Sequence, residues 1–150
     1  MLVYRLPRTP STPRITLWRK LRRLGVAQIV DGVVALPVGG DTREELEWLA
    51  EEVVQAGGEA TIWLADPATA AEHRALARAM TERIDAEYRA IAGEAHAARD
   101  SPPVERRRTL ARLRRELRRV AARQYFPTRE AGVARKAVDA LAKTTVGAAA

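Results

Sequence analysis

The chain of 150 residues contains no cysteine, which excludes disulfide bridges and thiolate metal sites and suits a reducing compartment. Aromatic residues are scarce at 5%, although hydrophobic residues make up 47%, so a core must be built mostly from Leu, Val, Ile and Ala. No run reaches the roughly 18 apolar residues of a membrane span, and the amino terminus lacks the apolar stretch of a signal peptide. We therefore predict a soluble, cytoplasmic protein without membrane association.

The sequence also has few candidate catalytic or metal-binding residues. The two histidines, His73 and His96, lie far apart and fit no metal-ligand spacing. Asp66, Asp85 and Glu87 form no recognisable carboxylate pair, and no glycine-rich phosphate loop is present. We predict that the protein is not an enzyme and has no catalytic residues, no metal site and no cofactor.

Acidic side chains are absent from residues 1–24, which hold seven basic ones. Residues 25–100 carry a net charge of −9, and residues 101–150 carry +9, so the total of +7 hides a strong segregation. Two alternatives follow. The basic ends either face an external polyanion or fold back onto the acidic middle of the chain.

The first 66 residues alternate between β-prone runs and amphipathic helices. Strands are expected at residues 2–6, 27–30, 33–36 and 60–64, and helices at residues 12–24 and 41–56. The order β-α-β-β-α-β is the ferredoxin-like arrangement, in which two helices cover one face of a four-stranded antiparallel sheet. We therefore predict an α+β protein with a ferredoxin-like module at residues 1–66.

Turn and cap residues mark the ends of these elements. Asp31-Gly32 predicts a β-hairpin with a type I′ turn, because glycine tolerates positive φ. Gly25 is expected to end the first helix, and Asp41 is expected to cap the second. The tryptophans are expected to pack: Trp18 and Trp63 in or beside the core, and Trp48 beneath other helices or a dimer partner.

From residue 67 onward the pattern is helical only. A long helix carries one apolar stripe, made by Leu76, Met80, Ile84, Tyr88 and Ile91. After a break at residues 100–103, a second helix has a seam at Leu110, Leu113, Leu117 and Val120, which predicts an antiparallel helical hairpin. A shorter helix follows at residues 128–142. We expect residues 67–143 to form an Arg-rich helical appendage packed on the first module, and residues 144–150 to be a frayed tail.

Several segments together resemble a known family. They are "ITLWRKLRRLG", "AQIVDGVVALP", "EELEWLAEEVVQAGGEATIWLA", "DAEYRAIAGEA" and "QYFP". In this order they are similar to the amino-terminal domain of the ChrB family, proteins of bacterial chromate-resistance operons. The resemblance implies a regulator or sensor linked to transcriptional control of chromate efflux. Family members commonly continue into a carboxy-terminal domain, which leaves open a separate partner that supplies it.

The resemblance and the segregated charge together favour a DNA-binding regulator that contacts phosphates through basic helices. The candidate residues for binding nucleic acid or an oxyanion are Arg14, Arg19, Lys20, Arg22, Arg23, Arg107, Arg108, Arg112, Arg114, Arg115, Arg118 and Arg119. Arginine suits planar, bidentate partners such as phosphate. The competing interpretation is that glutamates of residues 44–52 neutralise these side chains within the chain.

Two other functions remain open at this point. In the first, the seam of residues 110–120 and Trp48 meet a partner chain, as in a homodimer, and the module is a non-catalytic interaction domain. In the second, the arginines form a pocket for a small oxyanion such as chromate or sulfate. The operator, the effector and the oligomeric state are not encoded in any motif.

Overall fold

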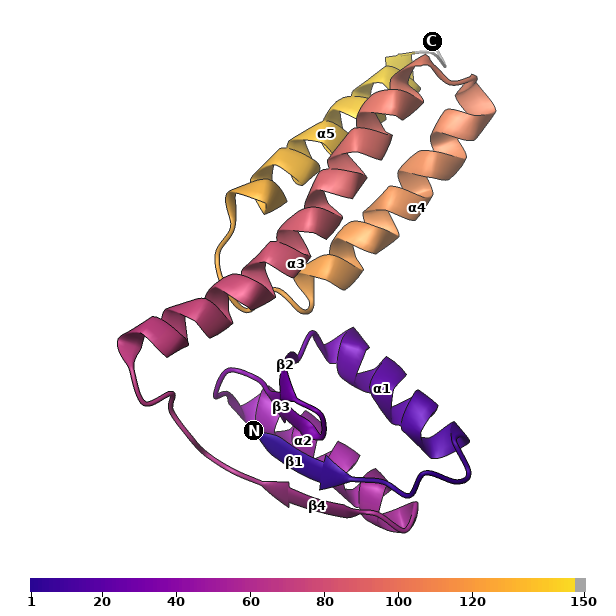
Figure 1. Cartoon of the computed structure of the whole chain (residues 1–150). Helices are drawn as coiled ribbons and strands as arrows, with labels where there is room; N and C mark the ends of the chain where they lie inside the picture. The colour runs from indigo at the N-terminus through magenta and orange to yellow at the C-terminus, as the bar shows by residue number, and fades with distance from the viewer. Residues whose placement is uncertain (148–150) are drawn as a thin grey trace. The chain divides into compact units, whose positions relative to one another are not determined.

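The computed structural model describes residues 1–147 and contains five α-helices and a four-stranded antiparallel sheet in that range (Figure 1). The elements are β1 (Leu2–Arg5), α1 (Thr12–Leu24), β2 (Ala27–Val30), β3 (Val33–Ala35), α2 (Gly40–Gln55), β4 (Glu59–Ile62), α3 (Ala70–Ala97), a short 3-10 turn η1 (Ala98–Asp100), α4 (Pro103–Ala121) and α5 (Arg129–Gly147). The α+β prediction is confirmed. No helix within this range is long and apolar enough to cross a membrane.

Two compact units divide the chain, Met1–Met80 and Thr81–Ala150, and each is described by itself. The division falls inside α3, whereas the sequence places a boundary after residue 66. Residues 144–147, expected to be frayed, continue the last helix α5. The rest of that expected tail, residues 148–150, lies outside the described residues.

The first unit is organised around the sheet, whose strand order is β2-β3-β1-β4. Leu2 of the central strand β1 pairs with Val34 on one side and with Ile62 on the other. Apolar side chains of α1 and α2 pack with those of the strands into one core, which includes Leu2, Leu17, Leu21, Val26, Val34, Leu46, Leu49 and Val53. Both helices thus contribute their apolar stripes to the same cluster, as amphipathic helices should.

The hairpin between β2 and β3 is confirmed, but its turn is not type I′. That turn needs positive φ at both central residues, and only Gly32 has it, at 76°. The mismatch is accommodated by a register shift between Gln28 and Val30. Gly32 also lies against β1: its carbonyl accepts a hydrogen bond from the Tyr4 amide at 2.8 Å, and an added Cβ would lie 2.5 Å from the Tyr4 carbonyl oxygen. Glycine is therefore required twice, for conformation and for space.

Helix ends follow the sequence at α1 and depart from it at α2. Gly25 ends α1 in the left-handed conformation with φ of 72°, as expected. In contrast, α2 begins at Gly40 with Gly39 as its N-cap, so the prediction of an Asp41 cap is wrong. Asp41 instead sits in the first turn, where its charge complements the helix dipole. The Thr42 hydroxyl fastens this end by donating to the carbonyls of Pro37 and Gly39.

The second unit is a helical bundle with its own core (Figure 1). Ile84, Tyr88 and Ile91 of α3 pack with residues of α4 and α5, and the Tyr88 hydroxyl donates to the Gln124 side-chain oxygen at 2.7 Å. The predicted seam faces inward: Leu110, Leu113 and Val120 are buried, and Leu117 packs against the same cluster. These side chains are therefore buried in the chain's own core, and the seam is not exposed for docking of a partner chain.

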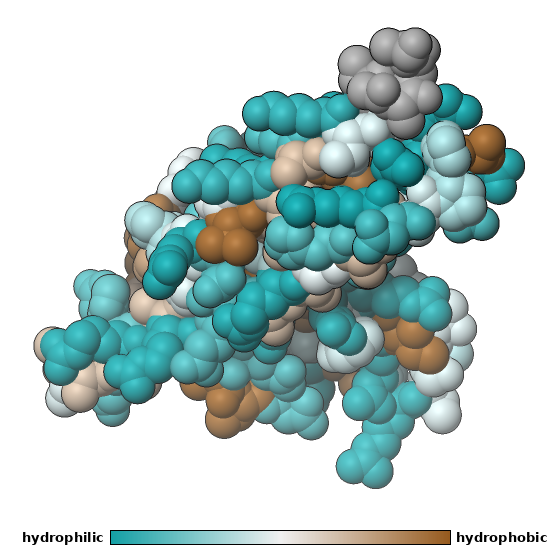
Figure 2. Space-filling view, turned by 90° about the horizontal axis from the view of Figure 1, so that it is seen from above, coloured by the Kyte–Doolittle hydropathy of each residue, from teal (hydrophilic) through white to brown (hydrophobic). Residues whose placement is uncertain are grey.

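The tryptophans are more exposed than the sequence indicates. Trp18, Trp48 and Trp63 are exposed by 49%, 64% and 55%. The expectation that Trp18 and Trp63 lie in or beside the core is therefore wrong, whereas cover of Trp48 by other helices or by a dimer partner stays a prediction. The indole of Trp63 donates to the Thr61 hydroxyl, and β4 ends before it at Ile62. On the face shown in Figure 2, hydrophilic side chains predominate and hydrophobic ones form separate small patches.

Candidate nucleic-acid interface

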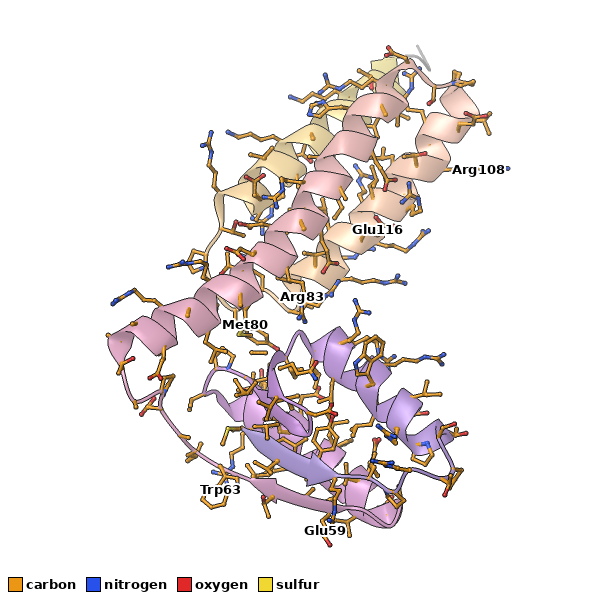
Figure 3. All side chains as sticks on the ribbon, in the orientation of Figure 1. Glu59, Trp63, Met80, Arg83, Arg108 and Glu116 are labelled. Atoms are coloured by element: carbon orange, nitrogen blue, oxygen red, sulfur yellow. The ribbon has the colours of Figure 1, made fainter. Side chains whose placement is uncertain are left out.

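The solvent side of α4 is an arginine face. Its members are exposed, and among the residues that the structure describes none of them has an ion-pair partner: Arg107, Arg108, Arg114, Arg115, Arg118 and Arg119. An α-helix turns about 100° per residue, so these positions share an arc of about 140°, opposite Leu113 and Val120. The face extends about 18 Å along the helix axis. Figure 3 shows Arg108 pointing outward from α4.

Other arginines of the same segment are held by carboxylates. Arg112 bonds to Glu94 of α3 and, at 2.9 Å, to Glu116 of α4. The bond to Glu94, followed by the bond to Glu116, raises the pKa of the Arg112 guanidinium. Arg123 forms an ion pair with Glu87 of α3. Arg112 lies on the flank of α4 and Arg123 lies just beyond its end, and at both positions the neighbouring helix α3 supplies an acidic partner.

Arg106, which precedes the arginine face, is held by backbone oxygens. Its guanidinium donates to the carbonyls of Thr144 and Ser101, and its Nε is buried without a partner in the described part of the chain. Of the nine arginines in the 103–123 segment, three are therefore occupied with holding the bundle together, and the six of the arginine face remain.

In α1 the basic residues divide likewise. The Lys20 ammonium lies 2.5 and 2.7 Å from the two carboxylate oxygens of Glu52. Arg22 stacks over Trp18, with 4.7 Å between guanidinium carbon and ring centroid. Arg14, Arg19 and Arg23 are exposed and have no ion-pair partner within residues 1–147.

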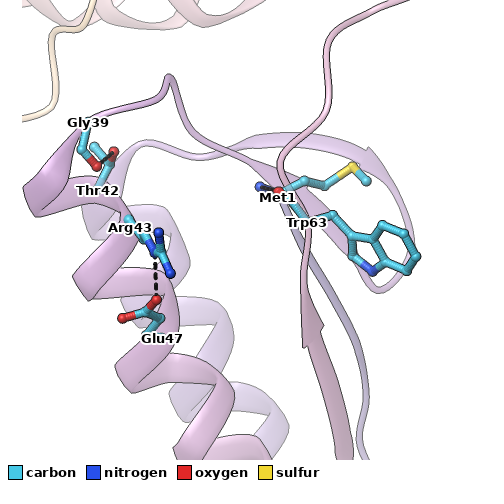
Figure 4. Close-up of polar contacts among 6 residues, drawn as sticks. All are labelled: Met1, Gly39, Thr42, Arg43, Glu47 and Trp63. Atoms are coloured by element: carbon cyan, nitrogen blue, oxygen red, sulfur yellow. Dashed lines mark hydrogen bonds and ion pairs between the residues drawn. The ribbon is translucent and has the colours of Figure 1, made fainter.

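The glutamates of residues 44–52 thus neutralise little of the basic surface. Glu52 forms an ion pair with Lys20. Glu47 forms an ion pair with Arg43 of its own helix, with 2.7 Å between Arg43 Nε and Glu47 Oε1 (Figure 4). The carboxylates that hold Arg112 and Arg123 come instead from α3 and α4. The sequence could not distinguish held from free arginines, because the distinction depends on which helix packs beside each position.

A cavity of about 650 Å³ opens beside the amino-terminal half of α1. Arg14, Trp18 and Arg19 line it from the helix, and the other lining residues are Tyr4, Arg5, Leu6, Ser11, Ile15, Asp31 and Gly32. Arg23 is not among them. A second, larger hollow of about 970 Å³ has a mostly apolar lining that includes Leu36, Val38, Trp63 and Leu64.

Tyr4, Arg5 and Asp31 were missed as site residues by the sequence analysis. They come from β1 and from the hairpin turn, and the pairing of β1 with β3, continued by the hydrogen bond from Tyr4 to Gly32, brings these segments together. Burial, and secondarily the charge of Asp31, raises the pKa of the Tyr4 phenol. Its hydroxyl therefore remains protonated at neutral pH and can donate a hydrogen bond.

The described residues contain no cluster of His, Asp and Glu suited to holding a metal ion. What the geometry provides is cationic: an arginine face on one helical unit and an arginine-lined cavity on an α+β unit. These features define a class of protein, an α+β chain with surfaces suited to binding anions.

Comparison with known proteins narrows this class. The chain belongs to the family of ChrB amino-terminal domains, because the family model described as Protein ChrB, N-terminal, matches residues 14–99. The chain is also 34% identical over 87 residues to Protein ChrB of Cupriavidus metallidurans. That alignment covers 55% of this chain and 26% of the relative, so the chain spans about a quarter of the length of that protein. No solved structure matches the present chain.

Proposed function

We propose that the protein is a regulatory domain that binds DNA by contacting phosphates through the arginine face of α4, supported by the free arginines of α1. The observation that carries the proposal is the division among the α4 arginines. Six stay exposed without a carboxylate partner in the described structure, although acidic side chains of α3 and α4 hold their neighbours.

An unneutralised face of this kind is costly unless it meets an anion, because like charges at helical spacing repel one another. Arginine, with its planar fork of donors, suits bidentate contact with phosphate. A face about 18 Å long can reach several phosphates, since duplex DNA carries one charge per roughly 1.7 Å of its axis. Such contacts position a protein on DNA without reading its sequence.

Membership of the ChrB family supports a role in the regulation of chromate resistance. The matched region, residues 14–99, contains most of α1 and all of α3 but ends before α4. The arginine face therefore lies outside the matched region, and its role is proposed from geometry alone. Lys20 and Arg112, which carboxylates hold, are excluded from the proposed contacts.

We also propose that residues 1–66 form a ferredoxin-like module and that the following helices, residues 67–143, are its appendage. The element order β-α-β-β-α-β and the sheet order β2-β3-β1-β4 support the first part. The helical core of α3, α4 and α5 supports the second. A cytoplasmic, non-catalytic protein is consistent with this role.

The test is salt-titrated binding to promoter DNA of the protein's own operon, comparing wild type with Arg114→Ala/Arg115→Ala/Arg118→Ala. Each phosphate contact contributes about 0.9 to the slope of log affinity against log salt, so the triple variant should lose about 2.7 from that slope. A charge-matched control, Arg8→Ala/Arg74→Ala/Arg78→Ala, removes exposed arginines outside α4 and should keep the wild-type slope. Binding by the wild type that is insensitive to salt would exclude the proposal.

A further inference from the structure

The cavity beside α1 combines features that the DNA contacts on α4 do not use. Two of its arginines, Arg14 and Arg19, have no ion-pair partner in the described part of the chain, and a third, Arg5, pairs only with the exposed Glu59 at 3.1 Å. The N-cap residue Ser11 also lines the cavity, and its side chain makes no capping hydrogen bond. The first turn of α1 contains no acidic residue. This end of the cavity favours an anion.

The rest of the lining is suited to an aromatic ring. Trp18 and Tyr4 both contribute side chains, together with the apolar Leu6 and Ile15. The Trp18 indole is half exposed, and Arg22, which does not line the cavity, stacks on its ring and so restrains it. A restrained, partly exposed indole is a platform on which a planar ring can stack.

Size and polarity refine the ligand class. A volume of about 650 Å³ lies within the range of small-molecule sites, which is roughly 300–1,000 Å³. A water molecule takes up about 30 Å³ of the liquid, and a tetrahedral oxyanion is only a few times larger. Such an anion would therefore fill only a small part of this cavity. Asp31 in the lining would repel a bare oxyanion but can accept hydrogen bonds from a ribose hydroxyl or a base amino group.

We propose that this cavity binds a nucleoside monophosphate unit, with its phosphate on Arg14 and Arg19, its base against Trp18, and its amino or hydroxyl donors on Asp31. The proposal does not depend on DNA binding by α4. The same chemistry is offered by a free nucleotide and by the end of a nucleic-acid strand, and the experiment distinguishes the two.

The experiment is isothermal titration calorimetry of the whole chain with AMP, adenosine, inorganic phosphate and sodium chromate, each at one fixed salt concentration. AMP should bind at least tenfold more tightly than any of the other three, because only AMP has both a ring and a phosphate. Equal affinity for AMP and for phosphate or chromate would show a simple anion site and overturn the proposal, as would no binding of AMP and no binding of a strand end.

Variants locate the site. Arg14→Ala/Arg19→Ala and Trp18→Leu should each lower AMP affinity at least tenfold, while their far-UV circular dichroism stays that of the wild type because all three side chains are exposed. The charge-matched control Arg8→Ala/Arg74→Ala should bind AMP within about twofold of wild type. Equal losses in the control and in Arg14→Ala/Arg19→Ala would contradict the assignment to this cavity.

A 5′-phosphorylated tetranucleotide of dA identifies the source of the ligand. Tighter binding than AMP, lost in Arg14→Ala/Arg19→Ala, supports a strand end, and binding no tighter than AMP supports a free nucleotide. The α4 variant Arg114→Ala/Arg115→Ala/Arg118→Ala should keep its AMP affinity. The AMP titrations therefore test the cavity, whereas the salt dependence of DNA binding in the α4 variant tests the arginine face, so that either proposal can fail without the other.

Discussion

Two pairs of arginines on the same segment allow the proposed division of roles to be tested at constant net charge. Arg114→Ala/Arg115→Ala removes two members of the arginine face, and Arg112→Ala/Arg123→Ala removes two side chains that carboxylates hold. Both variants lose the same two charges. Any difference between them must therefore come from where each side chain points.

The held pair should matter for stability. Arg112→Ala/Arg123→Ala breaks three ion pairs, those with Glu94, Glu116 and Glu87, whose side chains are one-third to one-half exposed. Pairs this exposed are screened by water and are worth roughly 0.2–1 kcal/mol each. We expect a loss of about 1–2 kcal/mol in unfolding free energy, measured by urea denaturation followed by circular dichroism. Arg114→Ala/Arg115→Ala should stay within about 0.5 kcal/mol of wild type.

The free pair should matter for DNA. Loss of two phosphate contacts lowers the salt slope by about 1.8, which makes the defect about 12-fold larger at 50 mM than at 200 mM salt. Arg112→Ala/Arg123→Ala should keep the wild-type slope. The measurement is fluorescence anisotropy with a labelled duplex. If both variants lower the slope equally, only net charge matters, and the argument from the arginine face is refuted.

Three further predictions concern the fold. Leu113→Ala in the bundle core should cost about 2–5 kcal/mol in chemical denaturation, whereas Val133→Ala on the exposed side of α5 should cost little; similar losses would contradict the core assignment. Gly32→Ala should destabilise by at least about 1–2 kcal/mol, because it needs positive φ and collides with β1; an unchanged melting temperature would argue against that turn. Burial raises the pKa of Tyr88 above its ordinary 10.0, so its contribution to stability is fully present below pH 10 and is lost as pH rises through the folded pKa. Tyr88→Phe should flatten that alkaline loss in urea midpoints, and an unchanged slope above pH 10 would contradict it.

Local patterns were sufficient for most of the elements. The left-handed Gly25 and the Asp31-Gly32 hairpin were readable because glycine alone tolerates positive φ without strain. The stripe of Ile84, Tyr88 and Ile91 was readable because helical periodicity places such residues on one face. The errors arose where alternatives of similar local energy compete. Gly39 rather than Asp41 is the N-cap of α2, and the Thr42 hydroxyl stabilises that end by donating to the Gly39 carbonyl.

The exposure of the tryptophans could not be read in the same way. Trp48 and Trp63 are apolar enough for a core, but their positions on α2 and after β4 turn them outward. Similarly, the cavity beside α1 needs β1, the hairpin turn and α1 at once, and no spacing within the sequence connects these segments.

The sequence alone determines the charge segregation, the helical seams and the turn glycines, because these are properties of residues that are close together in the chain. The tertiary structure decides which arginines lack an ion-pair partner. The nine arginines of the 103–123 segment are chemically identical and differ only in what packs beside them. Arg112 and Arg123 meet glutamates of an adjacent helix, whereas Arg114 and Arg115 face solvent. Ion pairing acts over a few ångströms between residues distant in sequence, and only folding sets those distances.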